Sequence, residues 1–204
     1  HELLKRLQEG GELPMITSCC PGWIKFAECF YPDLLDNIST CKSPQQMFGA
    51  IAKTFYAQQA GVDPADMVVV SVMPCVAKKF ECERPEMKAS GYQDVDCSLT
   101  TRELAQMLRE AGVDLSELEP EDYDDPLGAS TGAAVIFGAT GGVMEAALRT
   151  AYEVATGRAL PSLDFDDVRG LEGVKEAVIP VGELQLKVAV AHGLANARKL
   201  LDQL

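Results

Sequence analysis

Three cysteines lie where a thiolate could bind a metal. Cys19 and Cys20 occupy the turn before a helix that apolar spacing predicts over 23–30, and Cys75 follows the apolar run 67–73 after one proline. Both places follow predicted strands, a short one at 15–17 and one at 67–73, and α/β proteins collect their ligands at strand ends. The helix after Cys20 also favours thiolate over thiol. These residues predict metal ligands, but two cysteines cannot complete a zinc or iron–sulfur site, which usually has four protein donors.

The remaining cysteines are interpreted as small apolar residues, because free cysteine is among the most buried residue types. They are Cys29, Cys41, Cys82 and Cys97. The total of 7 is odd, and no two cysteines form a CxxC pair. Because the long helical and strand patterns need no disulfides, reduced thiols or metal ligands are favoured over a disulfide framework.

Local signals predict the helices that must position these cysteines. Ser43 is a predicted N-cap, with Pro44 at the first helical position, Gln46 placed to close a capping box, and Gly61 at the end of the helix. The apolar residues that should form its buried stripe are Met47, Ile51 and Phe55. A second boxed helix is predicted from Thr100 to Gly112.

Strands alternate with these helices along the chain. The run 67–73 is apolar almost throughout, as a strand buried on both faces must be. Later segments predict a strand at 133–137, a glycine turn at 138–142, a helix at 143–156, a hairpin of 177–181 with 184–191, and a helix at 194–204. The alternation predicts an α/β fold: two lobes of mainly parallel sheet flanked by helices, with the active site in the cleft between them. We expect lobe one at about 1–112, an acidic loop at about 113–126, and lobe two at about 127–204.

Composition and charge exclude several classes of partner. The chain of 204 residues has 47% hydrophobic residues, and no apolar run approaches the ~20 residues of a membrane span. With Lys+Arg 18 and Asp+Glu 31, the net charge of -13 repels phosphate backbones and anionic lipids. We therefore expect neither nucleic acid nor a membrane as a partner. Because the chain starts at His1 in a helical pattern without an initiator methionine, we also expect it to be part of a longer protein.

The segments around the cysteines resemble signatures of a known family. The segment TSCCPGW, 17–23, is similar to the first signature of the iron-only (FeFe) hydrogenases, and MPCVAKKFE, 73–81, is similar to the second. The resemblance continues in the same order through 42–45, 99–104, 137–149 and 168–171. By this resemblance the chain is identified as the catalytic domain of such a large subunit, truncated at both ends.

The resemblance implies a 4Fe–4S cluster held by four cysteines. One thiolate is shared with a two-iron subcluster that carries CO, cyanide and a bridging dithiolate whose amine relays protons. Cys20 and Cys75 correspond to two cluster ligands, and Cys19 corresponds to the proton donor, with Ser39 and Glu2 as outer members of the relay. A thiol suits this role because its pKa is about 8.5 when unperturbed.

The resemblance also assigns residues around the two-iron subcluster. Lys78 would donate a charge-assisted hydrogen bond to a cyanide nitrogen, the alternative being a solvated lysine. The residues expected to line the pocket, or else to be ordinary core, are Gln45, Met73, Pro74 and Phe137. The glycines of 138–142 indicate close backbone packing rather than a phosphate cradle, since no Gly-Lys-Ser/Thr follows. Arg6 would organise the proton entrance or lie on a solvated helix face.

The third signature of the family, which supplies the other two ligands, is absent, and no cysteine follows Cys97. We therefore expect this chain to be inactive alone and to need the C-terminal segment of the parent or a small subunit. The parent is expected to reduce protons reversibly to dihydrogen with a ferredoxin-like or nicotinamide-linked electron carrier, in the cytoplasm or, alternatively, in the periplasm with an exported partner.

Two other functions compete with this one. The first is a hydrogenase-like iron–sulfur assembly or sensory protein without dihydrogen turnover, and the second is a metal-free interaction module. Relatives of the assembly and sensory kinds tend to lack the cysteine beside the first ligand. The presence of Cys19 together with Lys78 therefore favours the catalytic function.

Overall fold

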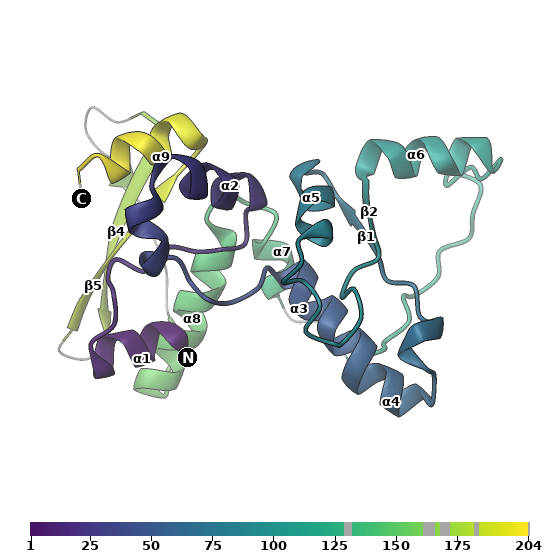
Figure 1. Ribbon diagram of the computed structural model, residues 1–204, viewed down its shortest axis with the longest axis horizontal. Coiled ribbons are helices and arrows are strands. Elements are labelled where there is room, and N and C mark those ends of the chain that lie inside the picture. Colours follow the sequence, from purple (N-terminus) through teal and green to yellow (C-terminus); the bar gives the residue numbers. More distant parts are fainter. Residues whose placement is uncertain (129–131, 161–165, 168–171, 182–183, 204) are drawn as a thin grey trace. The chain divides into compact units, whose positions relative to one another are not determined.

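The computed structural model describes residues 1–128, 132–160, 166–167, 172–181 and 184–203. They form two compact units. Unit 1 comprises His1–Thr17, Phe26–Ser39 and Ser130–Leu204, and unit 2 comprises Ser18–Lys25 and Thr40–Ala129. Both contain helices and strands, so the α/β class is confirmed (Figure 1). The segment predicted as lobe one is divided between the units, because its first part joins the C-terminal half of the chain.

Unit 2 is built around helices and a parallel pair of strands. Its elements are the first part of α2 (Pro21–Phe30), α3 (Pro44–Ile51), the π-helical turn η2 (Ala52–Tyr56), α4 (Ala57–Ala60), the 3₁₀ turn η3 (Pro64–Asp66), β1 (Val70–Met73), α5 (Ala77–Glu83), β2 (Cys97–Thr100) and α6 (Thr101–Glu110). β1 pairs with β2 in parallel, with Val70 opposite Cys97.

Helix caps in unit 2 follow the sequence signals. The Ser43 side chain accepts a hydrogen bond from the Gln46 amide, and Gly61 ends α4 in the left-handed region at φ 65°. Thr100 and Glu103 form both hydrogen bonds of a capping box at α6. The Gln46 side chain instead donates a hydrogen bond to the Cys82 sulfur at 3.5 Å. Of the two hydrogen bonds of the predicted capping box, the described contacts of Ser43 and Gln46 therefore include only the one accepted by the Ser43 side chain.

The predicted buried stripe of α3 is wrong. The predicted residues Met47, Ile51 and Phe55 are 40%, 45% and 54% exposed. The buried face instead contains Gly49 and Lys53. A tertiary contact decides which face is buried: Gly49 packs so closely on the loop between α5 and β2 that an added Cβ atom would lie 2.3 Å from the Asp94 carbonyl oxygen. Lys53 is tolerated on this face because its ammonium pairs with Asp96 at 2.7 Å.

β1 is shorter and more exposed than predicted. The apolar run 67–73 contains a strand only at Val70–Met73, and Val70 and Val72 are 49% and 43% exposed. Within the described residues the sheet of β1 has only β2 as a partner, so it is not covered as a central parallel strand would be. The expectation of burial on both faces is therefore wrong.

Unit 1 holds a small antiparallel sheet covered by helices. Its elements are α1 (Glu2–Glu9), the second part of α2, the 3₁₀ turn η1 (Pro32–Asn37), α7 (Ala133–Ile136), α8 (Gly142–Thr156), β3 (Asp166–Asp167), β4 (Val174–Val181), β5 (Leu184–Ala191) and α9 (Leu194–Leu201). β4 and β5 pair as the predicted hairpin strands; residues 182–183 lie outside the described residues. The expected parallel pairing is found for β1 and β2 in unit 2. The sheet of unit 1 is antiparallel and differs from the expectation, because β4 and β5 are only two residues apart in the sequence.

The core of unit 1 lies between α8 and the β4–β5 sheet. Leu148, Leu160 and Ile179 are buried there, and Leu3 of α1 packs against them. The helical pattern at the start of the chain therefore contributes Leu3 to this core. A largely apolar cavity of about 220 Å³ remains beneath α1, lined in part by Ala151.

The segment 133–137 is not the predicted strand. Residues Ala133–Ile136 form one helical turn, α7. The strand prediction is wrong because an apolar run this short does not distinguish strand from helix. The close backbone packing expected for the glycines is found at Gly142, where a Cβ atom would lie 1.8 Å from the Ile136 carbonyl oxygen. The predicted helix at 143–156 is confirmed as α8, and the one at 194–204 ends at Leu201. Residues 168–171 and 204, included in the expectations above, lie outside the described residues.

The acidic segment is exposed and contains no helix or strand. Residues 113–125 are exposed, as expected of a solvated loop. None of the helices in the described residues is both long and apolar enough to cross a membrane.

Candidate functional site

The two cysteine segments meet in unit 2 through a lysine. Cys20 directly precedes α2, and Cys75 lies two residues before α5. The Lys78 ammonium on α5 donates a hydrogen bond to the main-chain carbonyl of Cys19 at 2.8 Å. Cys20 and Cys75 are exposed and form no disulfide. The helix after Cys75 therefore holds the turn that carries Cys19 and Cys20.

Lys78 is buried and paired, which excludes the alternative of a solvated lysine. Its ammonium lies 3.1 and 3.0 Å from the two carboxylate oxygens of Glu81, one helical turn along α5. The side chains of Lys78 and Glu81 are 11% and 4% exposed. The neighbouring Lys79 forms a more exposed pair with Glu103 at 2.5 Å. Glu103 also caps α6, and the Lys79 hydrogen bond is the main reason that its pKa is lowered to about 2.

Glu81 is the centre of a buried polar network. Its Oε2 accepts hydrogen bonds from Ser43 Oγ at 2.8 Å and from Gln45 Nε2 at 3.2 Å, in addition to the ion pair. Gln45 Oε1 accepts from Ser71 Oγ on β1 at 2.9 Å. Gln45, predicted to line the cofactor pocket, is thus held in a network with Lys78. The second signature, 73–81, contains Glu81 but implies no role for it, although its spacing of three residues after a lysine is a helical ion-pair signal.

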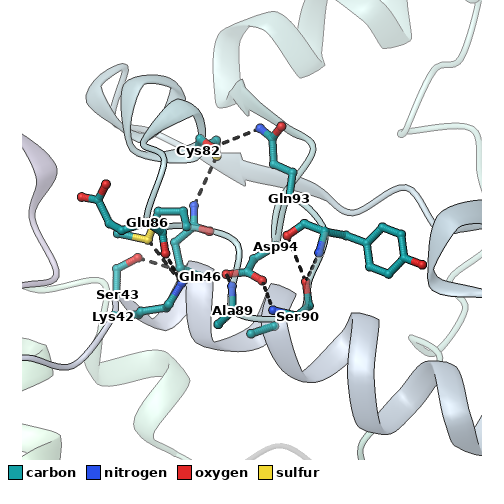
Figure 2. Close-up of polar contacts among 12 residues, drawn as sticks. Lys42, Ser43, Gln46, Cys82, Glu86, Ala89, Ser90, Gln93 and Asp94 are labelled. Carbon is teal, nitrogen blue, oxygen red and sulfur yellow. Dashed lines mark hydrogen bonds and ion pairs between the residues drawn. The ribbon is translucent and has the colours of Figure 1, made fainter.

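Cys82 is a structural residue, as predicted. It is 3% exposed, and its sulfur accepts hydrogen bonds from the side-chain amides of Gln45 at 3.2 Å and Gln46 at 3.5 Å. Figure 2 shows Gln46 and Gln93 converging on this residue. Burial raises the pKa of the Cys82 thiol. The expectation of burial is wrong for the exposed cysteines Cys29, Cys41 and Cys97.

A buried carboxylate fixes the loop that packs against α3 (Figure 2). Asp94 is 0% exposed and accepts hydrogen bonds from Lys42 Nζ at 2.8 Å and from the amides of Ser90 at 2.9 Å and Ala89 at 3.1 Å. Burial alone would raise the pKa of Asp94, but the hydrogen bonds from Lys42 and Ser90 outweigh burial and lower the pKa. The loop that contacts Gly49 is therefore held in one position.

The predicted outer relay residues meet in unit 1. Ser39 Oγ donates to Glu2 Oε2 at 2.5 Å, and Arg6 donates to Glu2 Oε1 at 2.8 Å. Arg6 also donates to the carbonyls of Asn37 and Ile38, and its side chain is 12% exposed. It is therefore not on a solvated helix face. The relay from Ser39 to the thiol in unit 2 stays a prediction.

The other predicted lining residues are placed but have no observed ligand contact. Met73 ends β1 half-buried, and Pro74 beside it is exposed. Phe137 follows α7 in unit 1 and is 41% exposed. Their contact with a cofactor stays a prediction.

The donor set fits part of a four-thiolate cluster. Two unpaired thiols, Cys20 and Cys75, lie in one unit on segments joined by a lysine. Within the part of the chain that the structure describes, no group of three or more His, Cys, Asp or Glu side chains could hold a metal ion. Cys20 and Cys75 are thus two thiols of the expected chemistry, and their role as cluster ligands stays a prediction.

Comparisons with known proteins agree with the two signatures. Residues 1–204 match the family described as "Iron only hydrogenase large subunit, C-terminal domain". The chain is 62% identical to NADP-reducing hydrogenase subunit HndD of Solidesulfovibrio fructosivorans, over 93% of this chain and 32% of that protein. It is 52% identical to the periplasmic Fe hydrogenase large subunit of Nitratidesulfovibrio vulgaris, over 98% of this chain and 48% of that protein.

Solved structures and a second group of relatives extend the comparison. The apo form of a variant of FeFe-hydrogenase HydA1 from Chlamydomonas reinhardtii superimposes with a TM-score of 0.81 at 42% identity, covering 100% of this chain and 58% of that one. Cytosolic iron-sulfur assembly component 3 of Rattus norvegicus is 37% identical, over 100% of this chain and 45% of that protein. The chain thus spans between a third and about half of the length of these curated relatives.

Proposed function

This chain belongs to the family of the iron-only hydrogenase large subunit, C-terminal domain, and we propose that in the complete protein it forms part of a centre that reversibly reduces protons to dihydrogen. The observation that carries the proposal is the 2.8 Å hydrogen bond from Lys78 to the Cys19 carbonyl. This bond joins the two cysteine signatures, each of which contributes one proposed ligand.

Each residue of the site has a proposed role. Cys20 and Cys75 provide two of the four thiolates of a 4Fe–4S cluster, and Cys19 carries the proton that its thiol can exchange near neutral pH. When bound, the cluster and its two-iron subcluster, with CO, cyanide and bridging dithiolate, supply the electrons and the iron at which dihydrogen is formed. Lys78 orients a cyanide ligand through a hydrogen bond. The residues proposed to exclude water are Gln45, Met73, Pro74 and Phe137.

The outer relay and the partners complete the proposal. Ser39 and Glu2 pass protons to the surface, with Arg6 fixing the carboxylate. The other two thiolates come from the C-terminal part of the parent or a small subunit, and this chain alone is inactive. A ferredoxin-like or nicotinamide-linked carrier delivers electrons. The relatives include a protein named as periplasmic and others named as cytosolic, and we propose the cytoplasm for this one.

A second function, in iron–sulfur assembly without dihydrogen turnover, is supported by 37% identity to an assembly component. The higher identity of 62% to a hydrogenase subunit favours the first function. Dihydrogen evolution from reduced viologen by the complete, matured protein separates the two. A protein that carries its cluster but evolves no gas would contradict the hydrogenase proposal.

Cysteine variants test the ligand assignment in the same protein. Cys20→Ala and Cys75→Ala should each abolish or damage the 4Fe–4S signal in electron paramagnetic resonance, because a cluster iron loses its thiolate. Cys29→Ala is the matched control, since Cys29 is an exposed cysteine on α2. Loss of the cluster in Cys29→Ala with retention in Cys75→Ala would show that the ligands are misassigned.

A further inference from the structure

We propose that Glu81 is a positioning residue for this centre: its carboxylate holds the Lys78 ammonium in a fixed orientation and offsets its charge. The inference rests on the proposed function, in which Lys78 faces a cyanide ligand. It assigns a role to a side chain that neither cysteine signature requires as a ligand or proton carrier.

The geometry fixes the direction of the lysine donors. Lys78 Nζ lies 2.8 Å from the Cys19 carbonyl oxygen and about equally far from both Glu81 oxygens, at 3.1 and 3.0 Å. An ammonium has three N–H donors in tetrahedral arrangement. When one N–H points to Cys19 and another is shared between the two Glu81 oxygens, the direction of the third is determined. Glu81 therefore aims the N–H that remains for a ligand.

The carboxylate itself cannot turn freely. Ser43 Oγ at 2.8 Å and Gln45 Nε2 at 3.2 Å both donate to Oε2. These donors come from α3, whereas Glu81 and Lys78 lie on α5. Ser43 and Gln45 fix the orientation of the Glu81 carboxylate through these hydrogen bonds, just as hydrogen bonds to a metal-binding side chain fix the orientation of that ligand. The Lys78–Glu81 pair is thus locked by a second helix.

Burial strengthens the electrostatic effect of the Glu81 carboxylate on the Lys78 ammonium and on a nearby cluster. With side chains 11% and 4% exposed, the pair is only weakly screened by solvent. Removal of the negative charge leaves an uncompensated buried ammonium. Because cluster potentials depend on nearby charge and hydrogen bonds, the reduction potential should become more positive when Glu81 is neutralised.

The adjacent lysine provides an internal comparison. Lys79 pairs with Glu103 at 2.5 Å, but these side chains are 39% and 45% exposed. The two pairs have the same chemistry and neighbouring lysines, and they differ in burial and in the contact to Cys19. Glu103→Gln is therefore the matched control for Glu81→Gln.

The experiment uses the complete protein, first without metal and then matured. In the metal-free protein, acylation of each lysine is followed by peptide mass spectrometry at fixed pH. Glu81→Gln should accelerate acylation of Lys78 several-fold, and Glu103→Gln should affect only Lys79. In the matured protein, Glu81→Gln should shift the infrared cyanide bands and raise the cluster potential, whereas Glu103→Gln should leave both unchanged.

The outcomes separate this inference from the proposed function. Unchanged Lys78 acylation and cyanide bands in a folded Glu81→Gln protein would overturn the positioning role. If the wild type evolves no dihydrogen and has no cyanide bands, the proposed function fails, whereas the acylation result still decides whether Glu81 holds Lys78. Glu81→Asp retains the charge but withdraws the carboxylate, so it should shift the cyanide bands with little change in potential. Wild-type bands in that variant would also refute the role, even if Glu81→Gln does not fold.

Discussion

Replacement of Gly49 by alanine tests how α3 is held against the rest of unit 2. The added Cβ would lie 2.3 Å from the Asp94 carbonyl oxygen and 2.7 Å from both the Asp94 carbonyl carbon and Val95 Cγ2. Since ordinary contacts begin near 3.4 Å, the helix and the loop must separate by about 1 Å. The loop resists this movement, because Asp94 is buried and held by Lys42 and two amides.

The expected loss can be worked out from this separation. Overpacking of a core contact costs about 1–3 kcal/mol, and the move also lengthens hydrogen bonds from α3 to Glu81 and Cys82, each worth about 1 kcal/mol. Alanine recovers about 1 kcal/mol of helix propensity over glycine. Gly49→Ala should therefore lower the free energy of unfolding by about 2–4 kcal/mol.

Gly22 in α2 is the matched control. It is also a helical glycine, but nothing lies within 4 Å of its added Cβ. Gly22→Ala should stabilise the protein by up to about 1 kcal/mol. Urea unfolding should show a lower midpoint for Gly49→Ala and a higher one for Gly22→Ala, both with unchanged m value. If Gly49→Ala were as stable as Gly22→Ala, the close contact beneath α3 would not exist.

Three further measurements concern single side chains. Cys19→Ser in the matured protein should lose about 10²–10⁴-fold in dihydrogen evolution with iron content and infrared bands retained; activity that falls only with iron would make Cys19 structural. Asp94→Asn should be less stable than the wild type at neutral pH, because the lowered pKa of Asp94 contributes stability above the ordinary aspartate pKa of 3.8. Below that pH the difference in stability should shrink as acid protonates the folded carboxylate, and a difference in urea unfolding that does not change with pH would contradict this. Ala151→Leu should fill part of the 220 Å³ cavity beneath α1 and stabilise unit 1 by about 1 kcal/mol in thermal unfolding, whereas destabilisation would mean that the cavity cannot accept the side chain.

Local chemistry made parts of the fold predictable. The cap at Ser43 and the box of Thr100 with Glu103 involve neighbouring residues only, so the sequence contains all of their partners. The buried face of α3 could not be predicted in this way. Its apolar stripe suggested Met47 and its helical neighbours, but the contact between Gly49 and a loop 45 residues later determines which face is buried.

The candidate site was predictable to a similar extent. Signature resemblance found Lys78 and the cysteines, because those residues carry the family chemistry. It includes Glu81 and Ser43 but implies no contact between them, because that contact arises only when α3 and α5 meet. A helical Lys–Glu spacing was visible in the sequence, but it is shared by many surface pairs, and only burial distinguishes this one.

The interleaving of the two units has a consequence for biosynthesis. The chain passes between units after residues 17, 25, 39 and 129, so unit 2 is complete once Ala129 has been translated. Unit 1 contains α1 but also needs β4 and β5, which are translated after all of unit 2. On the ribosome, Cys20 and Cys75 can therefore reach their folded surroundings while α1 still waits for the strands on which it packs.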